Sequence, residues 1–400
     1  MSSVEFGTLF EFIRNGMNIK QDKSGEGLPI TRIETIADAN INGFRVGYAG
    51  LEENDCRDWL MESGDILFSH INSVEHIGKC AVYRGAPEKL VHGMNLLCLR
   101  CNPAKLFPEF AKYLIRSPAF RSRLSTFINK AVNQASVSIG NLKTIPVVVP
   151  ALEEQRRIAG ILDRAEELRS KRREAIAQLD ALTPAIFLEM FGNPVINPKG
   201  WDWNTLGNIC AEIYRYPTFY GFEYQETGTP VARIGNILLD GRLDPDISNY
   251  VFIDPAISRQ FPRTILELQD IVMAVRGDGS TAKRIGLVTS DSLVSANISP
   301  NLLRFKAKAK VSHPLFLFHF MVSDLGQSLL ESYVTRTAKK TITAEVIKKI
   351  KIPLPPFSFQ QEFAHRVEAV EKLKAAHRAS LSELDTLFAS LQHRAFRGEL

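Results

Sequence analysis

Hydrophobic residues in the middle of the chain recur at spacings of three and four from position 158 to position 186. This spacing predicts a coiled coil, in which one stripe of a helix packs against a partner helix. The stripe comprises Ile158, Ile161, Ala165, Leu168, Ala175, Leu179, Leu182 and Ile186, and Arg172 is its one polar interruption. At ~1.5 Å per residue such a helix is about 43 Å long, so we expect a spacer or an interaction surface.

The residues that flank this stripe are typical of helix ends. Pro150 precedes the first turn, and Glu153 and Glu154 place negative charge at the positive end of the helix dipole. Gly192 follows the last apolar residues and is a common helix terminator. Pro184 lies inside the pattern and predicts a kink or the start of a new short helix.

The same pattern returns at the C-terminus at an offset of 205 residues, so that Ile158 corresponds to Phe363. The second stripe comprises Phe363, Val370, Leu373, Leu384, Leu387 and Leu391. Arg172 corresponds to His377, which puts a basic residue in the middle of both stripes. Either their side-chain stems pack while the charged ends reach solvent, or they form a polar layer that fixes the helix register.

The repeat extends upstream of both helices, because residues 65–67 match residues 270–272 at the same offset. A repeat of this length indicates a duplicated domain and not a solenoid. The sequence therefore predicts two domains, residues 1–149 and 194–353, each followed by a long helix, residues 150–193 and 354–400. A duplicated domain with its helix packs most simply about a pseudo-twofold axis, which makes the two helices antiparallel.

Short β-type and helix-type runs alternate inside each domain. Strands are expected near residues 65–69 and 96–100 in the first domain and near 270–275 and 302–305 in the second. Helices are expected at 108–115, 119–129 and 314–331. The fold class is therefore α+β, with two duplicated α/β domains separated by two long antiparallel helices that form a coiled coil.

Composition indicates a soluble globular protein, with 45% hydrophobic and 23% charged residues. The N-terminus lacks the features of a secretory signal, so a cytoplasmic location is expected. A net charge of +5 permits nucleic-acid binding without requiring it. The five cysteines show no disulfide spacing, and the single CxxC, Cys98 and Cys101, has no second ligand pair for zinc, so no metal site is expected.

Motifs for catalysis are missing from the sequence. There is no GxxxxGK[ST] loop, no GxGxxG after a strand, no HExxH and no Asn-Pro-Pro-aromatic stretch of the kind that amino-group methyltransferases use. The glycine-rich residues 276–281 lack the lysine and the helix start of a phosphate loop. We therefore expect no catalytic residues and no cofactor in this chain.

Polar and basic loops occur at matching places in the two domains, and these side-chain types suit base edges and phosphates. A merely solvated loop explains any single residue equally well, but four loops placed by the repeat favour DNA binding. In the first domain the candidates are His70, Asn72, Ser73, His76, Lys79, Asn133, Gln134, Ser136 and Ser138. In the second they are Arg276, Asp278, Ser280, Thr281, Lys283, Arg284, Thr335, Arg336, Thr337, Lys339, Lys340 and Thr341.

The chain resembles the specificity subunit of type I restriction-modification systems over essentially its whole length. The motifs that carry the resemblance are the two proline-led helix starts, residues 149–155 and 354–361, the ending at 395–400, and the domain entry at 203–207 that follows residues 190–194. Residues 4–10, where a tryptophan-led entry is usual, and Phe357 to Phe359 in the second helix start depart from the family pattern.

The resemblance implies a non-catalytic, DNA-binding subunit with two target-recognition domains, each of which reads one half of a bipartite site. It implies that the two helices space these domains and dock two methyltransferase (modification) subunits, and that restriction/translocase subunits join the complex. S-adenosylmethionine and ATP are then expected on those partner subunits. The alternative is a coiled-coil scaffold that binds protein partners and no nucleic acid.

Overall fold

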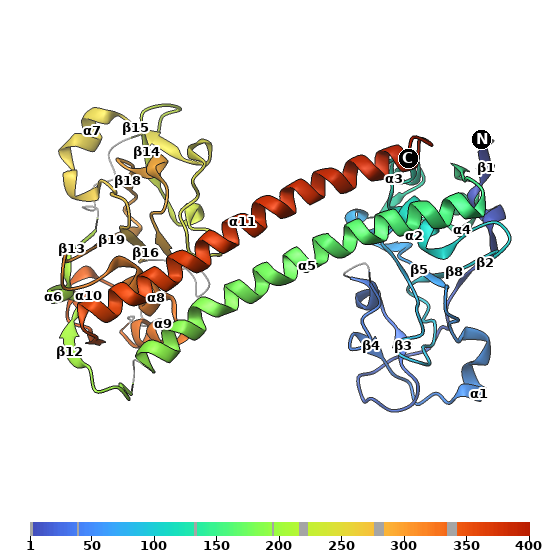
Figure 1. Cartoon of the computed structure of the whole chain (residues 1–400), viewed down its shortest axis with the longest axis horizontal. Coiled ribbons are helices and arrows are strands. Elements are labelled where there is room, and N and C mark those ends of the chain that lie inside the picture. The colour runs from blue at the N-terminus through green and yellow to red at the C-terminus, as the bar shows by residue number, and fades with distance from the viewer. Residues whose placement is uncertain are drawn as a thin grey trace. The chain divides into compact units, whose positions relative to one another are not determined.

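The computed structural model describes residues 3–37, 40–131, 134–193, 196–215, 223–275, 284–333 and 342–400. The chain forms two compact units, each made of a globular part and a segment of both long helices (Figure 1). Unit 1 comprises residues 1–173 and 379–400, and unit 2 comprises residues 174–378. The long helices, which the sequence assigned to segments of their own, are thus divided between the two units.

Each unit contains a four-stranded antiparallel sheet with the same strand order. In unit 1 the order is β2-β8-β5-β7, and in unit 2 it is β13-β19-β16-β17. The bounds are β2 Phe10–Asn15, β5 Ile66–Phe68, β7 Cys80–Val82 and β8 Leu97–Cys101, and β13 Cys210–Arg215, β16 Ile271–Ala274, β17 Ile285–Leu287 and β19 Leu302–Ala307. The expected strands are therefore present, and the repeat is a repeat of topology.

Short sheets flank the four-stranded ones. A two-stranded sheet pairs β1 (Ser3–Glu5) with β11 (Pro146–Val148), and its counterpart pairs β12 (Asp202–Thr205) with β20 (Lys351–Leu354). In unit 1, β3 (Ile30–Thr31) pairs with β4 (Val46–Gly47). In unit 2, β14 (Thr229–Ala232) lies between β15 (Val251–Ile253) and β18 (Asn297–Ile298). The two-stranded sheets of β1 with β11 and of β12 with β20 bring the start of each globular part back to the start of its long helix.

Helices cover one face of each four-stranded sheet. Unit 1 has α2 (Pro108–Arg116), α3 (Pro118–Ser125) and α4 (Ile139–Lys143), besides the short α1 (Glu53–Cys56). Unit 2 has α8 (Pro314–Val322), α9 (Asp324–Ser332) and α10 (Ala344–Lys348), with the short α6 (Leu206–Ile209) and α7 (Pro255–Gln260). The helix expected at 119–129 ends early, because Asn129 begins a strand, and the one expected at 314–331 is divided at Ser323.

The two long helices are α5 (Leu152–Phe191) and α11 (Phe357–Ala395). Pro184 lies inside α5, and the helix runs through it, so no new helix starts there. In unit 1, Arg169 Nε of α5 lies 2.6 Å from Asp385 Oδ1 of α11, and in unit 2, Lys374 Nζ lies 2.8 Å from Asp180 Oδ1. Within unit 2, Phe187 of α5 also contacts Phe363 of α11, with 5.6 Å between ring centroids, so residue numbers rise along α5 as they fall along α11 and the helices are antiparallel.

The buried stripe of the helices differs from the one predicted. Leu168, Leu182, Leu373 and Leu387 are exposed, so the prediction of these four as seam residues is corrected, whereas Ile161 is half-buried, as several residues of the observed seam are. The seam of α5 instead follows Ile158, Leu162, Ala165, Arg169, Arg172, Ile176, Leu179, Thr183, Ile186 and Met190, all buried or half-buried. That of α11 follows Phe363, Val367, Val370, Lys374, His377, Leu381, Leu384, Phe388, Leu391 and Ala395. Spacings of four and three alternate without a break in both lists, at the offset of 205.

A buried glutamine fixes the start of each long helix to its globular part. Gln155 accepts a hydrogen bond from the Phe107 amide at 2.8 Å and donates to the carbonyls of Lys105 and Pro150, both at 2.9 Å. Gln360 makes the same three bonds, from the His313 amide at 2.7 Å and to the carbonyls of Val311 and Pro355. Each side chain satisfies three main-chain groups that burial would otherwise leave unpaired.

None of the helices in the described part of the chain is long and apolar enough to span a membrane. All five cysteines are buried and free, and Cys98 and Cys101 both lie in β8. Among the described residues no group of three or more His, Cys, Asp or Glu side chains is placed to hold a metal ion.

Candidate nucleic-acid interface

The two predicted loops of unit 1 meet in one small sheet. Strand β6 (Ile71–Asn72) follows β5, and β10 (Gln134–Ser136) precedes α4. They pair antiparallel, with Asn72 opposite Ala135 and Ile71 opposite Ser136. Strand β9 (Asn129–Ala131) completes the order β6-β10-β9. The sheet therefore joins candidate residues about sixty positions apart in the sequence into one surface.

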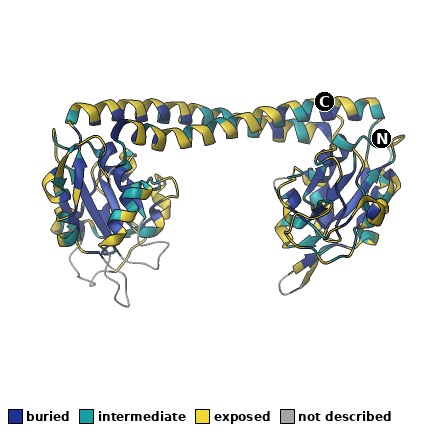
Figure 2. Ribbon diagram, turned by 90° about the horizontal axis from the view of Figure 1, so that it is seen from below, coloured by how far each residue is buried: buried dark blue, intermediate teal, exposed yellow. Residues whose placement is uncertain are grey.

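The β9–β10 hairpin carries exposed residues, unlike the buried central strands of unit 1 (Figure 2). Gln134 is exposed on β10, Ser136 is half-buried, and Asn133 lies outside the described residues. Ser138 caps α4, because its hydroxyl accepts a hydrogen bond from the Asn141 amide at 3.1 Å. The hairpin thus offers Gln134 to a ligand, whereas Ser138 has a structural task.

The residues after β5 divide into buried and exposed groups. His70 is buried, and burial lowers its pKa to about 4, so its imidazole is neutral near pH 7. Its carbonyl accepts a hydrogen bond from the Val137 amide, which holds the loop against the strand leading into α4. Asn72 accepts a bond from the Ser73 amide, and Ser73 is exposed. His70 therefore supports the surface from within.

Two further candidates of this loop are half-buried. His76 lies in the 3-10 turn η4 (Val74–His76), and Lys79 donates from Nζ to the Ala37 carbonyl at 3.2 Å. The lysine thereby ties the loop to residues near β4. Its ammonium group adds positive charge to the edge of the surface without projecting freely from it.

The sequence reasoning missed two exposed polar residues of β9, Asn129 and Lys130. Lys130 pairs in register with Ala135, so it stands beside the predicted residues of β10. The helix expected at 119–129 includes Asn129 but not Lys130, which belongs to no predicted element, and residues 129–136 carry no glycine or proline to mark a turn between two strands. The only sequence signal for these two residues is the polar run in the second repeat, residues 335–341, whose start corresponds to Lys130 at the offset of 205.

In unit 2 most predicted residues lie outside the described ranges. This applies to Arg276, Asp278, Ser280, Thr281 and Lys283, and to Thr335, Arg336, Thr337, Lys339, Lys340 and Thr341. The elements that bracket them, β16 and β17 on one side and α9 and α10 on the other, match the elements around the unit 1 surface. Arg284 is described and half-buried, and its Nη1 lies 3.5 Å from the Ile237 carbonyl.

A family model described as the type I restriction modification DNA specificity domain matches the chain twice, over residues 1–178 and 198–385. The two matches follow the duplication seen in the fold. Together they cover well over half of the 400 residues.

Curated relatives carry the same family name. The putative type I restriction enzyme MjaX specificity subunit of Methanocaldococcus jannaschii is 29% identical to this chain. The alignment is 419 residues long and covers 99% of this chain and 92% of the relative. The type I restriction enzyme EcoBI specificity subunit of Escherichia coli is 25% identical, covering 92% and 86%.

A solved structure supports the fold. The S subunit of a type I restriction-modification system from M. genitalium has a TM-score of 0.60 at 14% identity, covering 99% of this chain and 96% of the other. With the duplicated sheets, the antiparallel helices and the two family matches, this chain belongs to the type I restriction-modification specificity family, whose members recognise DNA and leave catalysis to other subunits.

Proposed function

We propose that each unit of this chain reads one half of a bipartite DNA site, with the two long helices joining the two readers. The observation that carries the proposal is the duplicated sheet whose equivalent loops bear polar and basic side chains in both copies. A scaffold that binds only proteins has no need for such loops at matching positions, and the DNA-specificity family match disfavours it. The proposal places the chain in the cytoplasm, where the DNA that it reads is found.

In unit 1 the reading surface is the β6-β10-β9 sheet with the loop after β5. Gln134 supplies an amide that can bond adenine in the major groove, and Lys130 supplies a cation for a phosphate or a guanine. A two-stranded ribbon is narrow enough to enter the major groove. The hairpin is therefore the element of unit 1 that we expect to carry base contacts.

Changing Lys130 and Gln134 separately to alanine tests this surface. Loss of a base contact should cost about 1–3 kcal/mol and relax the sequence preference of one half-site only, whereas loss of a phosphate contact should weaken all sequences alike and lower the salt dependence. Binding of the purified chain to a selected duplex, measured at two salt concentrations, separates these results. Lys89→Ala is the matched control, because Lys89 pairs with Glu53 beside α1.

Unchanged affinity, preference and salt dependence in both hairpin variants would show that this sheet does not touch DNA. Selection of random duplexes by the full chain should return two short conserved segments around an unread spacer. Return of a single continuous segment would contradict the assignment of one half-site to each unit.

We further propose that each unit docks one modification subunit through a pair of exposed leucines on its helical segments. The pair is Leu168 and Leu387 in unit 1 and Leu182 and Leu373 in unit 2, with exposed fractions between 41% and 53%. Leu168 corresponds to Leu373, and Leu182 to Leu387, at the offset of 205. The repeat thus supplies two equivalent apolar spots, one in each unit.

Helix geometry puts the two leucines of a pair on one face. Each comes immediately before a seam residue, so each is turned by ~100° in the same direction from the seam. A twofold axis that relates two antiparallel helices keeps that face common to both, so Leu168 and Leu387 lie on the same side of the helical pair.

The globular part of each unit covers the other side of its helical pair. In unit 1, Asp163, which follows the seam residue Leu162, accepts bonds from Tyr113 and Lys112 at 2.7 and 2.8 Å. In unit 2, Phe187, which follows the seam residue Ile186, packs on Phe316 of α8 with 6.0 Å between the ring centroids. The leucine faces are therefore turned away from the globular parts and are open to a partner.

Co-purification of modification subunits with the full chain tests the docking proposal. Leu168→Glu with Leu387→Glu should remove one of two bound subunits, and Leu182→Glu with Leu373→Glu should remove the other. Leu239→Glu is the control, because Leu239 is 96% exposed but lies in a loop and not on the helices. Retention of two subunits by both double variants would rule the leucine faces out. S-adenosylmethionine and ATP are assigned to the partner subunits in this proposal.

A further inference from the structure

The side chain of Phe44 is completely exposed, although it belongs to a well-braced loop of unit 1. The loop connects the 3-10 turn η2 (Ile33–Ile36) to β4. Ile41 within the loop, and Ile36 and Val46 at its two ends, pack into the core around Leu67 of β5. An aromatic ring left in water contributes nothing to the stability of this core, so the Phe44 ring is free to contact a partner.

A set of hydrogen bonds holds the backbone around Phe44 in one conformation. The Phe44 amide donates to Asn42 Oδ1 at 2.9 Å, and the Arg45 amide donates to the Asn42 carbonyl at 3.0 Å. Thr35 receives the Arg32 amide on its hydroxyl at 2.8 Å and donates to the Arg45 carbonyl at 2.6 Å. The loop therefore presents the ring without a further loss of backbone freedom on binding.

Unit 2 contains the same brace with a different residue at its tip. Asn236 receives the Arg233 amide at 2.9 Å and donates to the Asn249 carbonyl at 3.0 Å, as Thr35 does with Arg32 and Arg45. This correspondence places Ser248 where unit 1 has Phe44. Ser248 is exposed and bonds to Asp246. A shared frame with a variable tip is typical of loops that recognise a ligand.

The Phe44 loop adjoins the candidate DNA-reading surface. Lys79, at the end of the reading loop, bonds to the Ala37 carbonyl of the Phe44 loop. Both loops also rest on the same strands, because Ile36 and Ile41 pack with Leu67 of β5 and Ala81 of β7, and the reading loop connects β5 to β7. Seven residues separate Ala37 from Phe44, whose neighbour Gly43 lies against Pro87 in the β7–β8 connection, so a duplex that contacts both the reading loop and Phe44 must extend along the whole Phe44 loop.

We propose that Phe44 is an apolar wedge that contacts the DNA at a base step of the half-site read by unit 1. Apolar side chains inserted between base pairs partly unstack them, and pyrimidine–purine steps unstack most easily. Phe44 therefore adds a preference for a flexible step beside the bases that the hairpin reads. Unit 2, with Ser248, makes no such contact. The inference rests on the proposed DNA-reading function.

Binding of the full-length chain to duplexes selected from a random pool tests the wedge. Phe44→Ala should weaken binding to the selected site about tenfold, in the range of aromatic–base contacts, and Phe44→Trp should restore most of it. Ile196→Ala, which also removes an exposed apolar side chain but lies between α5 and β12, should bind as the parent chain does. 2-Aminopurine placed through the unit 1 half-site should brighten at one step on binding, and this signal should vanish with Phe44→Ala.

The outcomes separate the wedge from the wider function. If Phe44→Ala binds and brightens 2-aminopurine like the parent chain while Lys130→Ala binds more weakly, the wedge is wrong and DNA reading by unit 1 stands. Loss of a co-purified modification subunit from Phe44→Ala with unchanged DNA binding would show that the ring meets a protein instead. A parent chain that selects no sequence at all would overturn the proposed function itself, and the wedge with it.

Discussion

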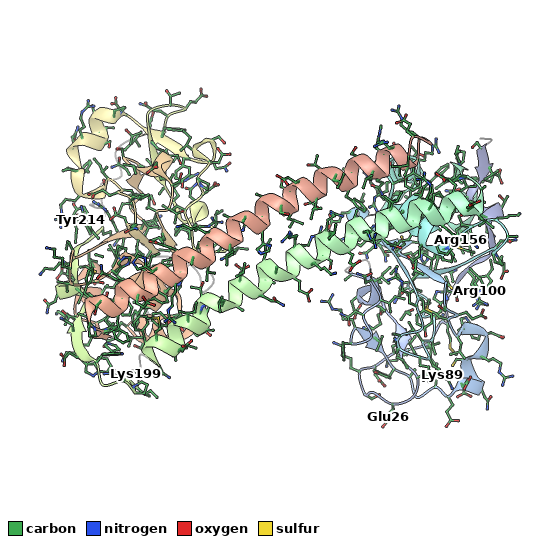
Figure 3. All side chains as sticks on the ribbon, viewed as in Figure 1. Glu26, Lys89, Arg100, Arg156, Lys199 and Tyr214 are labelled. Atoms are coloured by element: carbon green, nitrogen blue, oxygen red, sulfur yellow. The ribbon has the colours of Figure 1, made fainter. Side chains whose placement is uncertain are left out.

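Units 1 and 2 have sheets of the same strand order, and each sheet has a buried carboxylate beside it. The arginine that neutralises this carboxylate comes from a different position in each unit. Asp65 precedes β5 and Asp270 precedes β16, and both are buried. In unit 1 the carboxylate receives two bonds of 2.8 Å from Arg100, labelled in Figure 3. In unit 2, Asp270 is bonded by Arg304 at 2.6 Å.

The pairing registers show that these arginines do not occupy equivalent positions. Leu67 pairs with Cys98 in unit 1, and Val272 pairs with Arg304 in unit 2, so Arg304 takes the place of Cys98. Arg100 instead matches Lys306, which bonds to Glu267 at 2.6 Å. A buried carboxylate needs a cation nearby. In these two sheets that cation comes from positions two residues apart on the equivalent strand.

The different positions leave the two carboxyl groups in different environments. Arg304 is almost fully buried, whereas the side chain of Arg100 is 20% exposed. Burial raises the pKa of Asp270, and the Arg304 charge opposes this rise. The stability of unit 2 therefore depends more on Arg304 than the stability of unit 1 depends on Arg100.

Arg304→Ala should give the largest effect, a loss of about 3–5 kcal/mol in the free energy of unfolding, because it leaves buried Asp270 without this charged partner, although the Glu267 amide still bonds to it. Cys98→Ala at the equivalent position of unit 1 should cost about 1 kcal/mol, since it removes only a small apolar group. Hydrogen exchange, followed on peptides from β16 and β5, reports each unit separately. Equal losses of protection from the two substitutions would contradict the assigned difference.

Gln155→Ala and Gln360→Ala should each lower the free energy of unfolding by about 1–3 kcal/mol, because each removes the partner of one main-chain amide and two main-chain carbonyls. The two glutamines make the same three hydrogen bonds, so the two losses of stability should agree closely. Urea denaturation with hydrogen exchange at the start of α5 and of α11 measures both. A marked inequality would show that the two helix starts are held by different interactions.

The smallest difference is expected between Arg169→Ala and Lys374→Ala in the helix seam. Arg169 bonds to Asp385 and Glu166 and also lies over the Phe388 ring at 4.4 Å, whereas Lys374 bonds to the equivalent pair of carboxylates, Asp180 and Glu371. The arginine variant should lose about 1 kcal/mol more, the size of an added cation–π contact. Helix protection near residues 165–173 and 370–378 is the measurement. A larger loss from the lysine variant would contradict this expectation.

The sequence predicted the main strands and the duplication because each rests on local patterns. Buried runs such as 65–69 and 270–275 are apolar on both faces and need no knowledge of their neighbours. The hairpin of β9 and β10 was missed, because its polar residues become a strand pair only when β6, about sixty residues upstream, supplies the third strand. For the same reason, burial of His70 could not be foreseen.

The sequence alone determined that a globular part followed by a long helix occurs twice in the chain, because similar residues recur at an offset of 205. The tertiary structure decided which face of the helices is buried. Leucines are the natural choice for a seam, yet Arg169 and Lys374 occupy it and Leu168 and Leu373 do not. The reason is that Asp385 and Asp180, each supplied by the opposite helix, make it possible to bury a cation, and no pattern within a single helix reveals a partner two hundred residues away.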